Sequence, residues 1–457
     1  NQTVVLGFVL MITFTMSAWR LWQRKSSIVS NHKDLIYHQQ NIDGRSFFTN
    51  DIIDIAVESP TTDADLHSTT THLHTTQHLS HTEFDTGNDF RVDAWDETTW
   101  NRELTRRACV QQHFAKDMGW NERGPLMFLQ GCNVTPVLDF EAWAARECGS
   151  LPLEGDLIFH VGWTGPWLEH FMVDMCALLD SFLVTQNLDR SVLYFWLMDR
   201  QPDVDNDTFI KTFTVKGKGK IVFRFANTTE LSVGTCLHTT QHHHMWEPPG
   251  EIQPQTKSDL LRLLLLHKFG GVWVDTDTIL LRDLRPIVEY VGEFGGKFSM
   301  NQKFNNALMG LRKGSPASTE LLELSCAHPK SVTSSDVKNF CTVTGLPCNP
   351  HWWYNHNLLQ WGSRTGKLVA VPLQFFDPPN NCASRGMLSG SGARPMGAIT
   401  LDETLELVRG TFALHTRSYQ ARDRPLNPTS FFAQMFLRVS KLAEERMQKM
   451  NDNNNTN

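Results

Sequence analysis

Apolar and polar residues alternate along the middle of the chain in blocks that are typical of strands and helices. Short apolar runs at residues 156–161, 191–198 and 221–225 predict three strands. Between the first two runs, residues 167–188 place apolar side chains at helical spacing: Leu168, Phe171, Met172, Met175, Leu178, Leu179 and Phe182. Strands that alternate with helices favour a mostly parallel sheet with helices on both faces, so the predicted fold class is α/β.

The pattern continues through residues 257–283 as a helix, a glycine turn and a strand. The apolar helical segment ends at Gly270 and Gly271, two residues that release the backbone for a turn. Residues 272–274 are Val-Trp-Val, all of them β-forming, so they predict a buried strand.

Four charged side chains of this unit lie in two pairs, one on the helix and one at the end of the strand. Asp259 and Arg262 are three residues apart and share one face of the predicted helix. Asp275 and Asp277 follow the strand with one residue between them, so both carboxylates leave it on the same side. Carboxylate oxygens suit Mn²⁺ or Mg²⁺, and ligands of open α/β sheets bind at the carboxyl ends of strands. The pattern predicts a metal ion that clamps a diphosphate.

The segment resembles the DXD sugar-binding region of a glycosyltransferase family. That family includes fungal α-1,6-mannosyltransferases, α-1,4-galactosyl- and N-acetylglucosaminyltransferases and the sugar-transferring domains of large clostridial toxins. The shared pattern is Ser-Asp-x-x-Arg, an apolar helix, Gly-Gly, and an apolar strand into Asp-x-Asp, and residues 258–277 contain every part in order. The resemblance implies the GT-A fold, a Rossmann-like sheet joined to an acceptor-binding half. An ordinary helix–strand unit with capping acids is the alternative.

The resemblance also implies roles for single residues. Trp163, in a His-x-x-Trp sequence that ends the first strand, would stack on the nucleotide base. The catalytic set would be Asp259, Arg262 and Asn306, the donor-binding set Trp163, Asp259, Arg262, Asp275 and Asp277, and the metal ligands Asp275, Asp277 and His415. These residues also have purely structural alternatives. Trp163 would be a buried core residue, Asp259 and Arg262 a surface ion pair, Asn306 a turn residue and His415 a structural histidine.

The ends of the chain differ in composition from its middle. Residues 3–19 are apolar or small and uncharged, which predicts a membrane anchor within residues 1–25. The basic residues that follow this run would favour a cytosolic C-terminal side, whereas the resemblance implies a single-pass type II Golgi protein with a lumenal catalytic domain. We follow the resemblance in this expectation.

Composition and patterning also divide the rest of the chain into segments. Residues 26–100 include a Thr/His-rich stretch with little to bury and predict a disordered stem. Residues 101–150 predict a helical preface of uncertain structure, residues 151–440 the GT-A catalytic domain, and the Asn-rich residues 441–457 a disordered tail.

Cysteine usage and net charge limit the expected partners, metal sites and disulfides of the protein. The chain of 457 residues carries a net charge of −7, so nucleic acid is not an expected partner. None of the nine cysteines forms a CxxC pair, which argues against a zinc site. In a lumenal protein they would form disulfides, and the odd number leaves one unpaired. Cys176, in the strongly apolar helix, is the expected free thiol.

The sequence therefore predicts a metal-dependent, retaining glycosyltransferase that uses Mn²⁺ or Mg²⁺. It would move a hexose or N-acetylhexosamine from a nucleotide sugar, with a UDP-sugar favoured, to a glycan or glycolipid acceptor. The alternatives are a GDP-mannose-dependent α-mannosyltransferase and an inactive, membrane-anchored glycan-binding or partner subunit. The donor sugar, the acceptor and linkage, the disulfide connectivity and the oligomeric state stay open at this point.

Overall fold

The structure is a computed structural model, and it describes residues 96–116, 140–150, 153, 155–238, 254–297, 304–327, 359–376, 410–415 and 431–455. Contacts divide the chain into two compact units, residues 1–89 and 90–457, and all described residues belong to the second. The predicted anchor (residues 1–25) and the stem up to residue 95 lie outside the described residues. Within the described ranges, no helix combines the length and apolar character that crossing a membrane requires.

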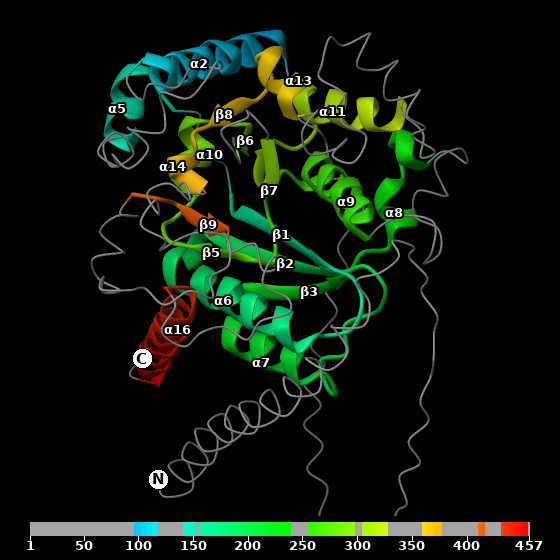
Figure 1. Ribbon diagram of the computed structural model, residues 1–457, viewed down its shortest axis with the longest axis vertical. Helices are drawn as coiled ribbons and strands as arrows, with labels where there is room; N and C mark the ends of the chain where they lie inside the picture. The colour runs from blue at the N-terminus through cyan, green and yellow to red at the C-terminus, as the bar shows by residue number, and fades with distance from the viewer. Residues whose placement is uncertain are drawn as a thin grey trace, which may run out of the picture. The chain divides into compact units, whose positions relative to one another are not determined.

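A seven-stranded sheet forms the centre of the second unit, in the order β3-β2-β1-β4-β7-β6-β8 (Figure 1). Its strands are β1 (Leu157–Trp163), β2 (Ser191–Leu197), β3 (Ile221–Phe225), β4 (Gly271–Val274), β6 (Phe294–Lys297), β7 (Phe304–Leu311) and β8 (Val369–Val371). Only β7 runs antiparallel to its neighbours, β4 and β6. The predicted α/β class and mostly parallel sheet are confirmed, and the three strand runs read from the sequence are β1, β2 and β3.

Helices cover both faces of the sheet. Alternate residues of β1 point to opposite faces: the ring of Phe159 packs edge-on against Phe182 of α6 (Glu169–Thr185), whereas His160 lies against Phe269 of α9 (Pro254–Phe269). The strand is therefore buried on both sides, which explains its nearly continuous apolar run. Further helical segments between the ends of this unit are α7 (Thr208–Gly217), α8 (Thr228–Ser232), α10 (Arg285–Tyr290), α11 (Pro316–Ala327), α13 (Leu359–Arg364), α14 (Leu373–Phe376), η1 (Leu188–Arg190) and η2 (Cys236–His238).

A two-stranded antiparallel sheet lies beside the main one. Its strands are β5 (Thr278–Leu280), which follows β4 after a short turn, and β9 (Ala413–His415), from near the end of the chain. In register, Thr278 pairs with His415, so the pairing brings residue 415 next to the Asp-x-Asp turn.

Before the first strand of the main sheet, helices α2 (Glu97–Lys116) and α5 (Phe140–Glu147) occupy part of the region predicted as a preface. Helix α2 begins four residues inside the predicted stem, so the stem boundary at residue 100 is wrong. The first turn belongs to this helix because the guanidinium of Arg107 lies 4.9 Å from the Trp100 ring centre and buried side chains of α2 enter the main core.

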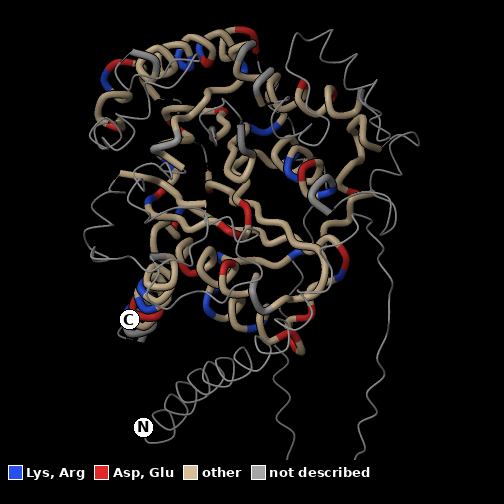
Figure 2. Tube along the Cα trace, in the orientation of Figure 1, with Lys and Arg blue, Asp and Glu red and all other residues tan. Residues whose placement is uncertain are grey.

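The predicted disordered tail is also wrong. Helix α16 spans Phe431–Asn455 and continues through most of residues 441–457. Its inward side chains recur at helical spacing, among them Phe432, Val439, Ala443 and Met447, which are buried. Outward positions carry both charges (Figure 2). The Asn-rich composition of the last residues concealed an amphipathic helix that packs against α6.

Among the described residues, two disulfides join parts of the second unit: Cys109 of α2 bonds to Cys148, the residue after α5, and Cys236 of η2 bonds to Cys326 of α11. Cys176 of α6 carries a free thiol, as expected from the sequence, and burial raises its pKa to about 12. The other cysteines lie outside the described residues.

Candidate metal and donor site

The glycine turn between α9 and β4 fixes where the site begins. Gly270 and Gly271 have φ values of 68° and 99°, a region that favours glycine. A Cβ on Gly271 would lie 2.2 Å from the carbonyl oxygen of Ile158 in β1, and one on Gly270 would lie 2.7 Å from the backbone nitrogen of Lys313. Only glycine lets the helix pass into a strand so close to its neighbours.

His160 of β1 holds this turn from the far side. The indole Nε1 of Trp196 donates to His160 Nδ1 (3.1 Å), so Nε2 carries the proton and donates to the Gly270 carbonyl oxygen at 2.9 Å. Complete burial lowers the pKa of His160 to about 4, with the charge of Arg224 adding to the effect. The histidine of the His-x-x-Trp sequence is therefore a neutral strut of the fold, a role that the sequence analysis did not assign.

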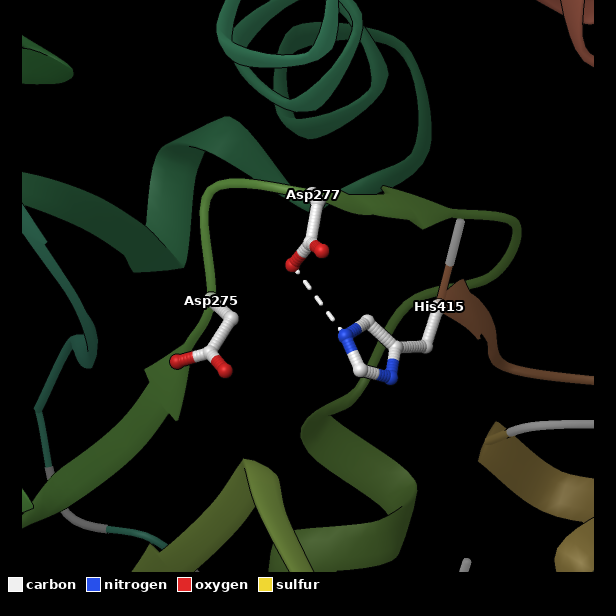
Figure 3. A group of neighbouring side chains, drawn as sticks. All are labelled: Asp275, Asp277 and His415. Carbon is white, nitrogen blue, oxygen red and sulfur yellow. Dashed lines mark hydrogen bonds and ion pairs between the residues drawn. The ribbon is translucent and has the colours of Figure 1, made fainter. Parts of the chain in front are cut away.

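Asp275, Asp277 and His415 converge on one point at the end of β4 (Figure 3). One ligand atom from each lies within 4.8 Å of the others, close enough to share a metal ion. His415 Nε2 is 3.1 Å from Asp277 Oδ1, and all three side chains are partly exposed. The set predicted from the sequence is thus brought together by the structure, including a histidine 138 residues beyond its aspartate.

The carboxylate of Asp275 is held by its neighbours in a fixed orientation. Its Oδ1 accepts a hydrogen bond from the indole Nε1 of Trp273 at 2.7 Å and lies 3.3 Å from Arg262 Nη2. The Arg262 guanidinium also stacks over the Trp273 ring, 4.9 Å from its centre. Trp273 is almost completely buried, so this donor is rigid. Its ring needs the small Gly162 beside it, since a Cβ there would lie 2.6 Å from the indole.

Asp259, Arg262 and Asn306 form a second, more buried group behind the first. Asn306 Nδ2 donates to Asp259 Oδ1 at 2.7 Å, and Arg262 Nη2 lies 3.1 Å from the same oxygen. Arg262 Nη1 also donates to the carbonyl oxygen of Asn306 at 2.5 Å. Burial raises the pKa of Asp259 to about 6, against the opposing charge of Arg262. These contacts connect α9 to β7 and fix the orientation of the Asp259 carboxyl, the Arg262 guanidinium and the Asn306 amide.

Trp163 ends β1 and is half-buried beside other aromatic rings. Its Nε1 donates to the Gly165 carbonyl oxygen (3.0 Å), and its ring stacks at 6.2 Å from Trp167 and meets Phe171 edge-on at 5.2 Å. β1 and β4 are parallel neighbours, so Trp163 and Asp275 follow the same edge of the sheet. The stacking role on a nucleotide base stays a prediction.

The chemistry of the donor set fits a divalent cation. Two carboxylates and one imidazole provide the oxygen and nitrogen ligands that Mn²⁺ accepts, and the half-exposed side chains leave access for further ligands. The oriented carboxylate of Asp275, the carboxylate of Asp277 and a ring nitrogen of His415 would hold the ion. When bound, such an ion would supply positive charge for the diphosphate of a donor.

Comparison with known proteins agrees with this geometry. Residues 205–292 match the family described as glycosyltransferase sugar-binding region containing DXD motif. An uncharacterised Arabidopsis thaliana protein is 30% identical over 164 residues, which are 35% of this chain and 23% of that protein. This chain therefore spans about a quarter of the length of that relative.

Two solved structures that match parts of the chain weakly are glycosyltransferases by name. PaToxG glycosyltransferase is 14% identical, with 72% of this chain and 99% of that chain covered at a TM-score of 0.31. The galactosyltransferase LgtC, solved with donor and acceptor sugar analogues, is 13% identical, with 63% and 96% covered at a TM-score of 0.33. Scores this low leave the argument to the sequence match and the site.

The sequence match and the arrangement of the site make residues 205–292 similar to one class of enzyme, the glycosyltransferases. Asp275 and Asp277 are the two acids of the DXD pattern within the matched residues 205–292.

Proposed function

We propose that the protein is a metal-dependent glycosyltransferase that moves a hexose or N-acetylhexosamine from a UDP-sugar to a glycan or glycolipid acceptor, with retention of configuration. The observation that carries the proposal is the convergence of Asp275, Asp277 and His415 beside the buried pair of Asp259 and Arg262. The metal ligands and Arg262 would face the diphosphate of a nucleotide sugar, and Asp259 beside them would face its hexose.

The residues of the chain divide the work between them. Asp275, Asp277 and His415 would hold Mn²⁺ or Mg²⁺, which neutralises charge on the leaving diphosphate. Arg262 presents a guanidinium that is already oriented by Asp259 and Asp275, so it can stabilise the same charge without reorganising. Asp259, ionised above a pKa of about 6, accepts hydrogen bonds from sugar hydroxyls.

Asn306 and Trp163 complete the proposed donor site. The Asn306 amide already donates to Asp259, so it sets the direction in which that carboxylate can receive a sugar hydroxyl. Trp163 offers an aromatic face at the end of β1 for the nucleotide base. In a retaining transfer, the acceptor hydroxyl bonds to the anomeric carbon on the face from which the diphosphate departs.

The proposed cellular setting is the Golgi lumen, with residues 1–25 as a type II anchor. Two disulfides support an oxidising compartment, because such bonds are rare in cytosolic proteins.

The test is donor hydrolysis by the purified protein with a panel of UDP- and GDP-sugars and Mn²⁺. We expect UDP-sugar cleavage that stops on chelation and falls at least about 100-fold in Asp277→Asn, because the ion loses a charged ligand. Asp205→Asn, which removes an exposed carboxylate elsewhere in the matched region, should leave the rate unchanged.

Thermal melting should show the same fold for wild type and both variants. Full turnover in a folded Asp277→Asn protein would overturn the metal assignment. Preferential cleavage of GDP-mannose would replace the UDP-sugar proposal with a mannosyltransferase.

A further inference from the structure

The three proposed metal ligands are supported by two different sheets. Asp275 follows β4 of the seven-stranded sheet, whereas Asp277 directly precedes β5 and His415 ends β9 of the two-stranded sheet. The geometry of the site therefore depends on whatever fixes the two-stranded sheet relative to the main one.

The two faces of the β5–β9 sheet pack against different partners. Leu280 and Ala413 face each other across the strands and are buried in the main core. The preceding cross-strand pair, Ile279 and Leu414, points to the opposite face and is also buried, at 1% and 4% exposed. This second face needs a cover of its own.

Helix α16 provides most of that cover. A second buried cluster, separate from the main core, contains Ile279 and Leu414 together with Ala177 of α6 and four residues of α16: Phe432, Met435, Phe436 and Val439. The four are spaced by three, one and three residues, so they form one stripe along α16. The outer face of the β5–β9 sheet thus rests on the first two turns of this helix.

Polar contacts fix α16 on α6. Ser440 Oγ donates to Asp180 Oδ2 at 2.6 Å, and Arg446 Nη1 donates to the carbonyl oxygens of Leu183 and Val184 at 2.7 Å each. Asp180 also pairs with Lys216 of α7. The helix is therefore held in one register on α6. Helix α6 in turn contacts β5, because Ser181 Oγ accepts a hydrogen bond from the Leu280 backbone N–H at 3.0 Å.

We propose that α16 is the positioning element of the metal site, with Phe436 as its main positioning residue. The inference rests on the proposed function. Leu414 and His415 are adjacent on β9, and their side chains point to opposite faces of the two-stranded sheet. Packing against Leu414 therefore fixes the position of the His415 side chain relative to Asp277. Loosening the second cluster would spread the three ligands apart while leaving each of them present.

The test is Mn²⁺ binding by the full chain, measured from the electron paramagnetic resonance signal of the unbound ion. We expect Phe436→Ala to raise the dissociation constant for Mn²⁺ about 10-fold, the lower end of what loss of a supporting residue causes. Leu437→Ala is the matched control, since the next residue of the same helix is 65% exposed against 9% for Phe436. It should bind Mn²⁺ within about two-fold of wild type.

A second control separates positioning from general loosening of α16. Met447→Ala removes a buried side chain of the same helix that lies outside the second cluster. We expect it to lower the melting temperature and to leave Mn²⁺ affinity unchanged. If Phe436→Ala does not fold, Val439→Ala takes its place, because it removes less of the same cluster.

The Mn²⁺ affinities of these variants distinguish the positioning role of α16 from general loosening of the fold and from the absence of a metal site. Wild-type Mn²⁺ affinity in folded Phe436→Ala or Val439→Ala protein would overturn the positioning role and leave the proposed function standing. An equal loss of affinity in Met447→Ala would also overturn it, because the effect would then be general. A wild-type protein that binds no Mn²⁺ would remove the metal site and this inference together.

Discussion

At the scale of single residues, the site is built from hydrogen bonds that fix carboxylates before any ligand arrives. Asp275 receives an indole N–H from Trp273 and lies beside Arg262, and Asp259 receives an amide N–H from Asn306. Donors that are already oriented avoid the cost of reorganisation when charge develops, which is the main electrostatic advantage of an enzyme site over water. Trp273, the buried aromatic residue of β4, is therefore part of the site.

Trp273→Phe tests this role of the indole. The substitution keeps an aromatic ring beneath Arg262 but removes the N–H that holds Asp275, so we expect Mn²⁺ to bind about 10-fold more weakly. Trp196→Phe is the control, because it also removes a buried indole donor but one that serves His160. Equal Mn²⁺ affinity in both variants, measured in the same titration, would remove Trp273 from the site.

His160 gives the fold a dependence on pH. Its pKa is about 4 in the folded protein against an ordinary value of 6.5, so the unfolded chain binds the proton more readily. Stability is therefore full above pH 6.5 and is lost as the pH falls toward 4. The loss is about 1.4 kcal/mol per pH unit in that window, or about 2 kcal/mol at pH 5.

The comparison that isolates this effect is His160→Gln, whose amide can still donate to Gly270 but does not titrate. Chemical denaturation at pH 7 and pH 5 should show a free energy of unfolding that falls about 2 kcal/mol further in wild type than in the variant. Parallel pH profiles for the two proteins would show that His160 is not a buried neutral strut.

At the scale of elements, helix α2 is attached to the edge of the main sheet by buried charges. Arg107 pairs with Glu293, which immediately precedes β6, and donates to the Lys367 carbonyl oxygen at 2.5 Å and to Glu103 Oε1 at 3.1 Å. Both glutamates are fully buried. A buried ion pair of this kind contributes little compared with an apolar contact, but its disruption leaves an uncompensated charge.

Arg107→Ala should therefore destabilise the protein by about 3–5 kcal/mol. The expected cost is large because Glu293 and Glu103 would lose a partner without gaining water. Arg102→Ala, an exposed position on the same helix, should change the free energy of unfolding by less than about 0.5 kcal/mol. Chemical denaturation measures both, and a loss below about 1 kcal/mol in Arg107→Ala would show that α2 is only loosely attached.

At the scale of the whole molecule, the compact unit of residues 90–457 includes α2 as part of its core. Phe114 of α2 is fully buried and meets Phe375 of α14 edge-on at 5.4 Å. The disulfide Cys109–Cys148 adds a covalent link to α5. The compact unit therefore begins before α2, upstream of residue 151, where the sequence predicted the start of the GT-A domain.

A protein that begins at Phe90 should keep the melting temperature and donor hydrolysis of the full chain, because it retains every described contact of the unit. A protein that begins at Asp117 lacks α2 and should be insoluble or melt at a much lower temperature, since the partners of Phe114 and Arg107 would be exposed. Both are to be produced in an oxidising compartment. Normal stability in the shorter protein would contradict the assignment of α2 to the core.

The sequence by itself determined the local parts of this protein. Periodicity encoded β1, β2, β3 and α6, and the motif from Ser258 to Asp277 specified a glycine turn and a pair of carboxylates, because each feature depends on residues close together in the chain. The fold class and the acidic half of the site followed from those parts.

Only the tertiary structure decided how distant parts meet. It paired His160 with Gly270 across 110 residues, and His415 with Asp277 across 138 residues. It also showed α16 where composition had predicted a tail, since a helix with one apolar stripe becomes stable only when another surface covers that stripe. Local propensity selects the elements, whereas burial between them selects the contacts that make a site.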